Sequence, residues 1–176
     1  SYSLNHRIGS PLKVRNNSLS LDDLDIRILK ALQEDARQTY TVIGQRLGVA
    51  HSTVYDRIRK LEAQGVIKGY TALIDYEKAG AKYVTAIMAI YTDPKESEKV
   101  AEKLCEYPQI LEVYVSISEE IQVIAKVIAE NQEDLHNFIA KFIAPLPGVL
   151  RIRTSIVTKK LKEGCVPPIN NLNIQH

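Results

Sequence analysis

The sequence predicts an α+β fold in two parts: an N-terminal helix-turn-helix (winged-helix-like) domain and a C-terminal ferredoxin-like βαββαβ domain. The first observation is that apolar residues recur at helical spacing in three short segments between residues 21 and 65, with Gly48 in a tight turn before the third segment. The second is that strand and helix patterns alternate from residue 83 onward in the order βαββαβ. With 176 residues and 45% hydrophobic content, the chain is long enough for two small cores.

Residues 1–20 are predicted to form a flexible basic arm. They include Arg7, Lys13 and Arg15 but no acidic residue, and they show no apolar period. Two interpretations remain open: the arm contacts DNA phosphates, or it is an expression remnant or disordered leader without a binding role.

The first two helices of the N-terminal domain, residues 21–65, are recognisable from their ends. Ser20 is expected to cap the first helix, with Asp23 at its third position. The inner stripe of this helix consists of Leu24, Ile28, Leu29 and Leu32. The second helix is expected over about Tyr40 to Leu47 and ends at Gly48, which adopts the left-handed conformation readily. Its apolar residues are Val42, Ile43 and Leu47.

The third helix, about His51 to Ala63, is predicted to present a polar face outward. Val54, Ile58 and Leu61 fall at i, i+4 and i+7 and therefore pack inward. The outward face and the exposed N-terminal end make up the candidate DNA-binding set: His51, Ser52, Thr53, Tyr55, Asp56, Arg59 and Lys60.

These residue types suit a major groove. Arg59 can offer a fork to guanine, and Tyr55 can reach a phosphate. A carboxylate near phosphates is unfavourable, so Asp56 is expected to pair with Lys60 at the i, i+4 spacing. The outer face of any small helical bundle has a similar composition. On these residues alone, the face could be a DNA-binding surface or simply the solvated side of the bundle.

The rest of the chain divides into a linker, a second domain and a tail. Residues 66–80 are expected to form a hinge strand or linker, because residues 66–75 alternate loosely. Residues 81–160 are the ferredoxin-like dimerisation and effector domain, and residues 161–176 are a C-terminal tail. The expected strands are 83–91, 110–118, 121–129 and 149–158, and the expected helices are 94–107, capped by Asp93, and 132–143, capped by Asn131. The inner stripes of these helices are Val100, Ala101 and Leu104, then Leu135, Phe138, Ile139 and Phe142.

The first strand of this domain predicts a homodimer. It is apolar on both faces, with Ala86, Met88 and Ile90 on one side and Ile87 and Ala89 on the other. In a two-layer fold one sheet face would otherwise meet water, so a second copy is the simplest cover, with higher assembly as a further option.

Composition excludes several classes of protein. No apolar run approaches the roughly 20 residues that span a bilayer, and no secretion signal is present, so a cytoplasmic protein without a membrane partner is expected. Cys105 and Cys165 have no Cys or His at ligand spacing, so neither a metal site, a cofactor nor a disulfide framework is predicted. Residues 1–80 hold 12 Lys/Arg against 9 Asp/Glu, an excess that places the basic charge in the first half.

The order of residues along the chain resembles the Lrp/AsnC family of feast/famine transcriptional regulators, over about residues 21–162. The first half shows Leu21-Asp22, Asp25, Ile28-Leu29, Leu32, Asp35-Ala36-Arg37, Leu47-Gly48, Val54, Arg57-Ile58, Leu61-Glu62, Gly65-Val66-Ile67 and Gly80. The second shows Leu135, Pro147-Gly148-Val149 and Arg153-Thr154-Ser155-Ile156-Val157. The resemblance implies a DNA-binding regulator, dimeric or octameric, that grips a partly palindromic operator with half-sites about 10–10.5 bp apart or a multiple of this. It also implies a second domain that senses an amino acid between subunits.

Three departures from the family pattern matter. Ala50 replaces the usual Ser, so a cap worth about 1 kcal/mol is missing or is supplied by His51 or Ser52. Gly44 replaces the usual Ala and weakens the second helix by up to about 1 kcal/mol. Glu119 and Gln122 stand where the family tends to carry Gly and Asp in the amino-acid pocket.

The third departure concerns the effector. Glu119 adds bulk and, with Glu120, negative charge that repels an α-carboxylate, so the effector is absent, cationic or otherwise unusual. The candidate effector-binding residues are Ser118, Glu119, Gln122, Thr154 and Ser155, although ordinary strand-end residues would look the same.

Two alternative functions compete with that of a specific regulator. A nucleoid-type architectural protein would bind and bend DNA of many sequences. It differs from a specific regulator in the ratio of its affinity for a specific site to its affinity for random DNA. A sirohaem-decarboxylase-like enzyme would need His or Arg gathered in a cleft, whereas His6, His51, His136 and His176 are scattered along the chain. We therefore expect no enzyme and assign no catalytic residues.

Overall fold

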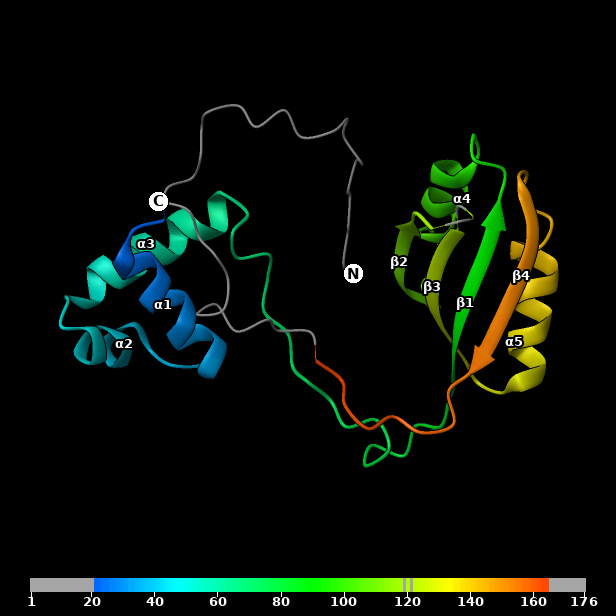
Figure 1. The fold of residues 1–176 in the computed structure, drawn as a ribbon. Coiled ribbons are helices and arrows are strands. Elements are labelled where there is room, and N and C mark those ends of the chain that lie inside the picture. Colours follow the sequence, from blue (N-terminus) through cyan, green and yellow to red (C-terminus); the bar gives the residue numbers. More distant parts are fainter. Residues whose placement is uncertain (1–20, 119, 121, 165–176) are drawn as a thin grey trace. The chain divides into compact units, whose positions relative to one another are not determined.

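The computed structural model describes residues 21–118, 120 and 122–164, in two compact units (Figure 1). The described part of the first unit is residues 21–72 with Gly164, and the second unit is Leu73–Glu163. The predicted arm, residues 165–176 of the predicted tail, and the candidate residue Glu119 lie outside the described residues.

The first unit is built from three helices, α1 (Asp23–Glu34), α2 (Tyr40–Leu47) and α3 (His51–Ala63). Their shared core consists of Ile28, Ala31, Ile43, Val54 and Ile58, all of them buried. The predicted inner residues of α3 are confirmed. Val42, expected inside, is 44% exposed, because Ile43 and Gly44 occupy the buried side of this short helix.

The predicted cap of α1 was wrong by two residues. The N-cap is Asp22, not Ser20: its carboxylate accepts from the Asp25 amide at 2.8 Å, while the Asp25 carboxylate accepts from the Asp22 amide at 3.1 Å. This reciprocal capping box satisfies two amides that a helix start otherwise leaves without partners. Asp25, rather than Asp23, is therefore the third residue of the helix.

The expected strand over residues 66–75 is not formed. No strand is assigned between α3 and Val84, and Leu73 is 80% exposed. A strand needs a neighbouring strand for its backbone groups, and this segment joins no sheet within the described residues. The boundary between the two units falls within it, between Ala72 and Leu73.

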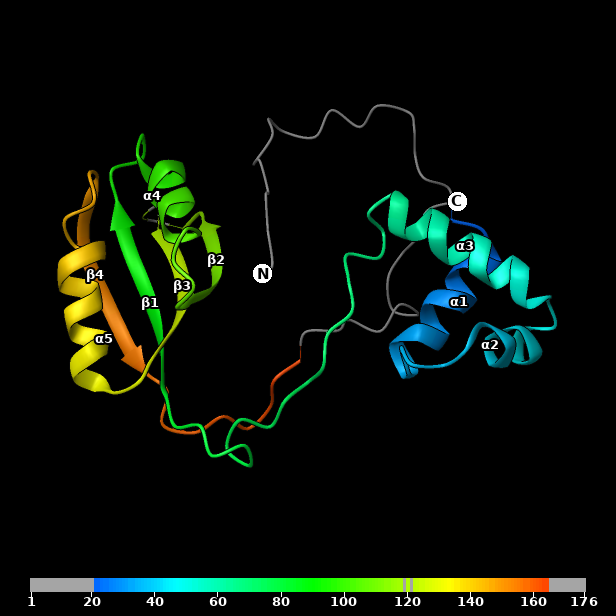
Figure 2. The same cartoon turned by 180° about the vertical axis from the view of Figure 1, so that it is seen from behind.

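The second unit is a four-stranded antiparallel sheet in the order β2-β3-β1-β4. Its elements are β1 (Val84–Thr92), α4 (Ser97–Leu104), β2 (Ile110–Ser116), β3 (Gln122–Ala129), α5 (Gln132–Phe138), a π-helical turn η1 (Ile139–Ile143) and β4 (Val149–Ile156). The predicted βαββαβ order is confirmed, and Figure 2 shows α4 and α5 on one face of the sheet. Alternate strand residues such as Ala86, Met88 and Ile90 are fully buried beneath these helices.

The first predicted helix of this unit is shorter than expected, whereas the second spans the predicted residues 132–143 as α5 followed by η1. Asp93 accepts from the Lys95 amide at 2.9 Å, but residues 94–96 form a turn, and α4 begins at Ser97 without a side-chain cap. α5 is capped by Asn131 as predicted, then widens into η1, where the Ala144 amide reaches the Ile139 carbonyl at 2.8 Å. The wider turn shifts the helical phase by one residue. Ile143 is therefore fully buried, and Phe142, predicted to face inward, is 41% exposed.

The sheet face opposite the helices has an apolar centre. The strand register pairs Ala89 with Ile124 of β3 and Tyr91 with Gln122, while Ile87 lies opposite Lys126. We call this surface the outer sheet face and define its centre as Ile87, Ala89, Tyr91, Tyr114 and Ile124. Ile87 is 38% exposed, as expected for an apolar residue that no other described element of the chain covers.

Candidate nucleic-acid interface

The turn between α2 and α3 is set by two glycines. Gly48 ends α2 with φ 72°, in the left-handed region that glycine adopts without strain. Gly44 lies against the turn itself, because a Cβ on Gly44 would be 2.6 Å from the Val49 carbonyl oxygen. The sequence signalled Gly44 only as a weakened helix position; in the structure its missing side chain lets the turn pack directly on α2.

α3 starts without a side-chain cap. Ala50 is the N-cap residue, and among the described residues no side-chain cap hydrogen bond forms at this helix start. Neither His51 nor Ser52 therefore replaces the serine that the family pattern leads one to expect.

The predicted DNA-binding residues lie on one surface of α3. Six are exposed, namely His51, Ser52, Tyr55, Asp56, Arg59 and Lys60, whereas Thr53 is half-buried. Tyr55 is 45% exposed, and its ring packs edge-on against Tyr40 of α2 with 5.5 Å between ring centroids. The packing orients Tyr55, and Tyr40 is a neighbour that the sequence pattern did not identify.

The expected ion pair between Asp56 and Lys60 is not formed in the described part of the chain, where neither side chain has an ionic partner. Both groups are exposed, and a solvated i, i+4 pair contributes only about 0.3–0.5 kcal/mol. Water therefore competes well for both charges. Lys60 is left available to another anion.

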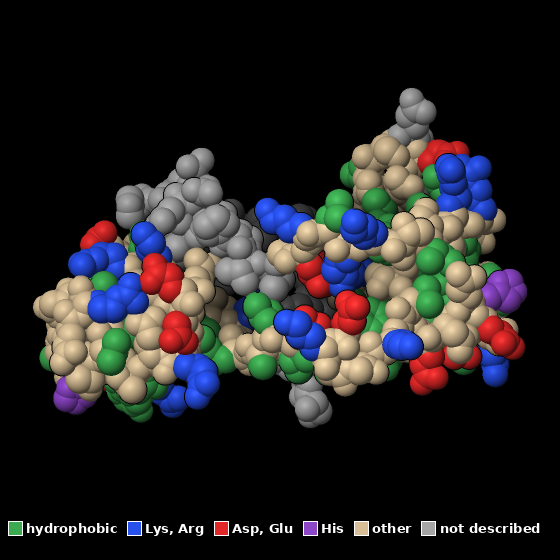
Figure 3. All heavy atoms as spheres, turned by 90° about the horizontal axis from the view of Figure 1, so that it is seen from below, with side chains coloured by type: hydrophobic (Ala, Val, Ile, Leu, Met, Phe, Trp, Pro, Cys, Tyr) green, Lys and Arg blue, Asp and Glu red, His purple; other side chains and the backbone are tan. Residues whose placement is uncertain are grey.

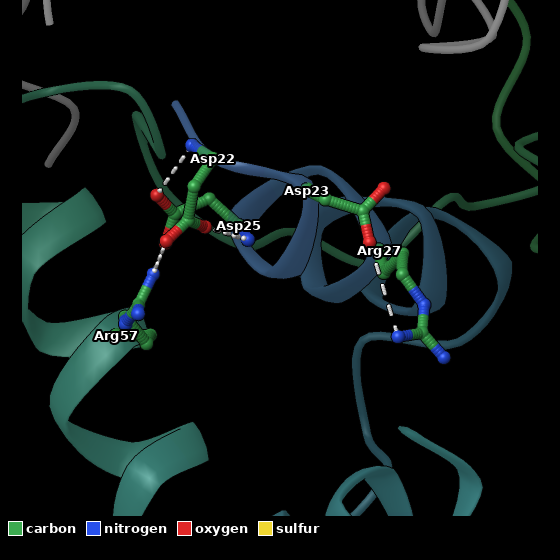
Figure 4. Close-up of polar contacts among 5 residues, drawn as sticks. All are labelled: Asp22, Asp23, Asp25, Arg27 and Arg57. Atoms are coloured by element: carbon green, nitrogen blue, oxygen red, sulfur yellow. Dashed lines mark hydrogen bonds and ion pairs between the residues drawn. The ribbon is translucent and has the colours of Figure 1, made fainter. Parts of the chain in front are cut away.

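Arg57 is a further residue of α3 with a defined role, and sequence reasoning missed it. It points away from the exposed face, toward Asp22 and Asp25 at the start of α1 (Figure 4), and its guanidinium donates to both carboxylates. The hydrogen bonds from Arg57 and from the Asp25 amide lower the pKa of Asp22 to about 2. The carboxylate spacing of the capping box was the available signal, but nothing local connected it with Arg57.

Charge on the surface is mixed in sign. Figure 3 shows Lys and Arg side chains interspersed with Asp and Glu on the face that it displays. The net charge is only +2. A polyanion would therefore be held by particular side chains rather than by a uniformly basic surface.

The candidate effector residues occupy separate places in the second unit. Gln122 begins β3 opposite Tyr91, and Ser118 lies in the preceding loop, where its hydroxyl bonds the Glu120 carbonyl at 2.8 Å. Thr154 and Ser155 pair with Met88 and Ile87, three and four residues along β1 from Tyr91. Adjacent strand residues point to opposite faces, so Thr154 and Ser155 do not line one cleft of a single chain.

An ion pair stands near Ser118 and Gln122. Arg151 of β4 bonds Glu120 at 2.8 Å and lies over the Tyr91 ring, 4.1 Å from its centroid. The guanidinium thus balances the Glu120 charge, which was expected to repel a carboxylate. Glu119 and Ile121, on either side of Glu120, are among the residues not described.

The second unit also has a groove of about 570 Å³ between α5 and β4. Its walls are mainly apolar, with Leu135, Ile139 and Ile152 among them, and Thr154 is the one described effector candidate in the lining.

Two kinds of feature are absent from the described residues. No cluster of His, Cys, Asp or Glu within them is arranged to hold a metal ion. Among the same residues, no helix has the length and apolar character needed to cross a membrane.

Two family models match the chain, one over each unit. Residues 21–62 match the AsnC-type helix-turn-helix domain, and residues 85–167 match the Lrp/AsnC ligand binding domain. The HTH-type transcriptional regulator FL11 of Pyrococcus horikoshii is 40% identical over 149 residues, which cover 85% of this chain and 97% of the relative. Ptr1 of Methanocaldococcus jannaschii, also named an HTH-type transcriptional regulator, is 33% identical over 85% of this chain and 99% of its own length.

Solved structures show the same fold. Escherichia coli AsnC aligns with a TM-score of 0.71 at 23% identity, over 83% of this chain and 97% of AsnC. The regulator NMB0573 of Neisseria meningitidis, in complex with L-Met, aligns with a TM-score of 0.73 at 24% identity, over 85% and 97% of the two chains. From the two family models and these relatives, the chain belongs to the Lrp/AsnC family of transcriptional regulators.

Proposed function

We propose that this regulator binds a partly palindromic operator in a sequence-specific manner, as a homodimer or a higher oligomer such as an octamer, in the cytoplasm. A small molecule such as an amino acid modulates the binding through the second unit. The role is regulatory rather than catalytic, in agreement with the names of the relatives.

The observation that carries this proposal is the polar face of α3. Arg59, Lys60 and Ser52 are exposed together on a helix whose opposite side is fully buried. A helix presented in this way fits the major groove, where Arg59 reads guanine and Lys60 holds phosphate. His51, Thr53, Tyr55 and Asp56 complete the proposed DNA-binding surface.

The outer sheet face supports the homodimer. An exposed apolar patch at the centre of a sheet indicates a contact surface, and a two-fold axis would place two α3 helices on successive turns of the same DNA face. The operator would then have half-sites about 10–10.5 bp apart, or a multiple of this distance.

An effector is supported by the match to a ligand-binding domain and by the L-Met complex of the Neisseria meningitidis protein. Because Glu120 is already paired with Arg151, it need not repel the carboxylate of an amino acid. We assign Ser118, Glu119, Gln122, Thr154 and Ser155 to this site as candidates. Since Thr154 and Ser155 face opposite ways, different subunits would have to contribute to one pocket.

The test is a footprint of the purified protein on DNA upstream of its own gene, at about physiological salt, with random DNA as competitor. A symmetric protected site that resists the competitor supports the proposal, and a shift caused by one member of an amino-acid panel identifies the effector. Uniform protection that the competitor removes would instead favour an architectural DNA-binding protein. Absorbance in the haem region, or tetrapyrrole binding, would reopen the sirohaem-decarboxylase-like alternative.

A further inference from the structure

Arg57 connects α3 to the start of α1 through two carboxylates (Figure 4). Its side chain is 30% exposed and lies on the boundary between the buried stripe of α3 and the exposed face. The guanidinium Nη1 donates to Asp22 Oδ2 and, at 3.1 Å, to Asp25 Oδ1. The helix that carries the proposed DNA-binding residues is therefore attached to a second helix by directional, charge-assisted bonds.

All four carboxylate oxygens of this cluster are engaged. Asp22 Oδ1 accepts from the Asp25 amide and Asp25 Oδ2 from the Asp22 amide, while the other two oxygens accept from Arg57. Asp25 is only 2% exposed. A buried carboxylate that loses its cation is strongly unfavourable, so the cluster holds Arg57 in one position.

The apolar stripe of α3 is less selective than this cluster. Val54, Ile58 and Leu61 pack through contacts that are weak individually and have no preferred direction. Hydrogen bonds to charged groups depend strongly on distance and angle. Successive helix residues are about 100° apart, so the direction in which Arg57 is held also sets the direction in which Asp56 and Arg59 face.

We propose that Arg57 is a positioning residue for DNA recognition. It sets the rotation of α3 about its own axis and so decides which side chains meet the base edges, without contacting DNA itself. This inference rests on the proposed function, since it needs a protein that distinguishes one DNA sequence from another.

The test compares binding to a specific site with binding to random DNA. The site is selected from a random pool with the wild-type protein, and both Kd values are measured by fluorescence anisotropy at one stated salt concentration. The variant is Arg57→Met with Asp25→Asn, which removes the cation and the buried charge together, so that no unpaired carboxylate remains in the core. The thermal melt of each protein is recorded in parallel.

The matched control is Arg46→Met. Arg46 also forms bonds between elements, to Glu34 at 2.8 Å and to Gln38 at 2.8 Å, but it joins α2 to the end of α1 and does not involve α3. The Arg46→Met substitution therefore removes an arginine and an ion pair from the same unit, but leaves the contacts of α3 intact.

The double variant is expected to lose about tenfold or more in the ratio of specific to random affinity, with random binding nearly unchanged and the control ratio retained. An equal loss on both DNAs would overturn the inference, because it would make Arg57 a phosphate contact. So would an unchanged ratio in a folded variant. If the double variant does not fold, Arg57→Gln decides: its uncharged amide is two bonds shorter and cannot replace the Nη1 donor to both carboxylates, so a ratio that stays at the wild-type value refutes positioning. A wild-type protein with no preference would defeat the proposed function itself.

Discussion

At the scale of single residues, α3 carries side chains with different tasks. Arg59 and Lys60 are adjacent and exposed, but a guanidinium can read guanine through two hydrogen bonds whereas an ammonium acts as a point charge. Arg57, two residues earlier than Arg59, is directed into the protein instead. Neighbouring cations of one helix are therefore expected to respond differently to mutation.

Arg59→Ala is expected to cost about 1–3 kcal/mol on the specific site and to relax sequence preference at one position. Lys60→Ala is expected to weaken binding to all sequences alike. It should also reduce the slope of log affinity against log salt concentration by about the amount that one phosphate contact contributes. Binding titrations on specific and random DNA over a range of salt concentrations distinguish the two. Identical losses for both variants on both DNAs would contradict this assignment.

Acid should destabilise the first unit through Asp22. Arg57 and the Asp25 amide hold the Asp22 pKa at about 2, below the unfolded value of about 3.9. A carboxyl whose pKa is lower in the folded state stabilises the protein fully above about pH 4 and loses that contribution as the pH falls toward about 2. Denaturant titrations between about pH 6 and about pH 2 should show the free energy of unfolding falling in this window. Asp22→Asn should flatten the decline; a slope equal to that of wild type would exclude Asp22 as its source.

At the scale of elements, close approach and helical phase decide how the pieces meet. Gly44 allows the turn carbonyl of Val49 to lie where a side chain would be, and η1 turns the end of the α5 segment by one residue. Both features concern the relation between one segment and the next, and both are expected to affect the stability of the unit that contains them.

Gly44→Ala is expected to destabilise the first unit, although alanine favours helices. The gain in helix propensity is up to about 1 kcal/mol, whereas crowding a packed contact costs about 1–3 kcal/mol. The 2.6 Å approach to the backbone oxygen of Val49 leaves no flexible side chain to move aside. Urea denaturation measures the difference, with Gln45→Ala at an exposed position of α2 as the control. A Gly44→Ala variant that is more stable than wild type would contradict this prediction. It would mean that the turn between α2 and α3 can move away from the added methyl group.

Ile143→Ala is expected to cost more than Phe142→Ala. Ile143 is fully buried, and its truncation should cost about 2–5 kcal/mol. Phe142 is 41% exposed and packs on Tyr107 and Phe138 with part of its ring, so its loss should be smaller. Thermal unfolding of the two variants compares them directly. The reverse order would mean that the π-helical turn is absent in solution and that the α-helical phase continues.

At the scale of the whole molecule, the outer sheet face is the surface on which assembly depends. Ile87→Asp should introduce two like charges near the centre of a two-fold interface and shift the dimer toward monomer, with weaker binding to a two-half-site operator. Sedimentation equilibrium measures the change in mass. Leu150→Asp is the control, because Leu150 is 71% exposed and lines the groove beside α5 rather than the outer face. A variant that remains dimeric would place the interface elsewhere.

Local pattern was sufficient for most of the elements, though not for the expected strand over residues 66–75, and for the polar face of α3. The buried stripe of α3, the Gly48 turn, the Asn131 cap and the order βαββαβ were all predictable, because helical and strand periodicities repeat every few residues and depend little on distant contacts. The opposite directions of Thr154 and Ser155 were also contained in the strand period, and grouping them in one cleft of a single chain overlooked it.

Only the tertiary structure decided the contacts between distant segments. Arg57 meets Asp25 and Asp22 across 32 and 35 residues, Gly44 meets the carbonyl of Val49 through the fold of the turn, and Arg151 meets Glu120 across 31 residues. The widened turn that buries Ile143 in place of Phe142 likewise has no sequence period. Sequence by itself determined which face of each element is apolar, because that follows from local geometry. Which polar groups meet depends on how those faces pack, and packing is a property of the whole chain.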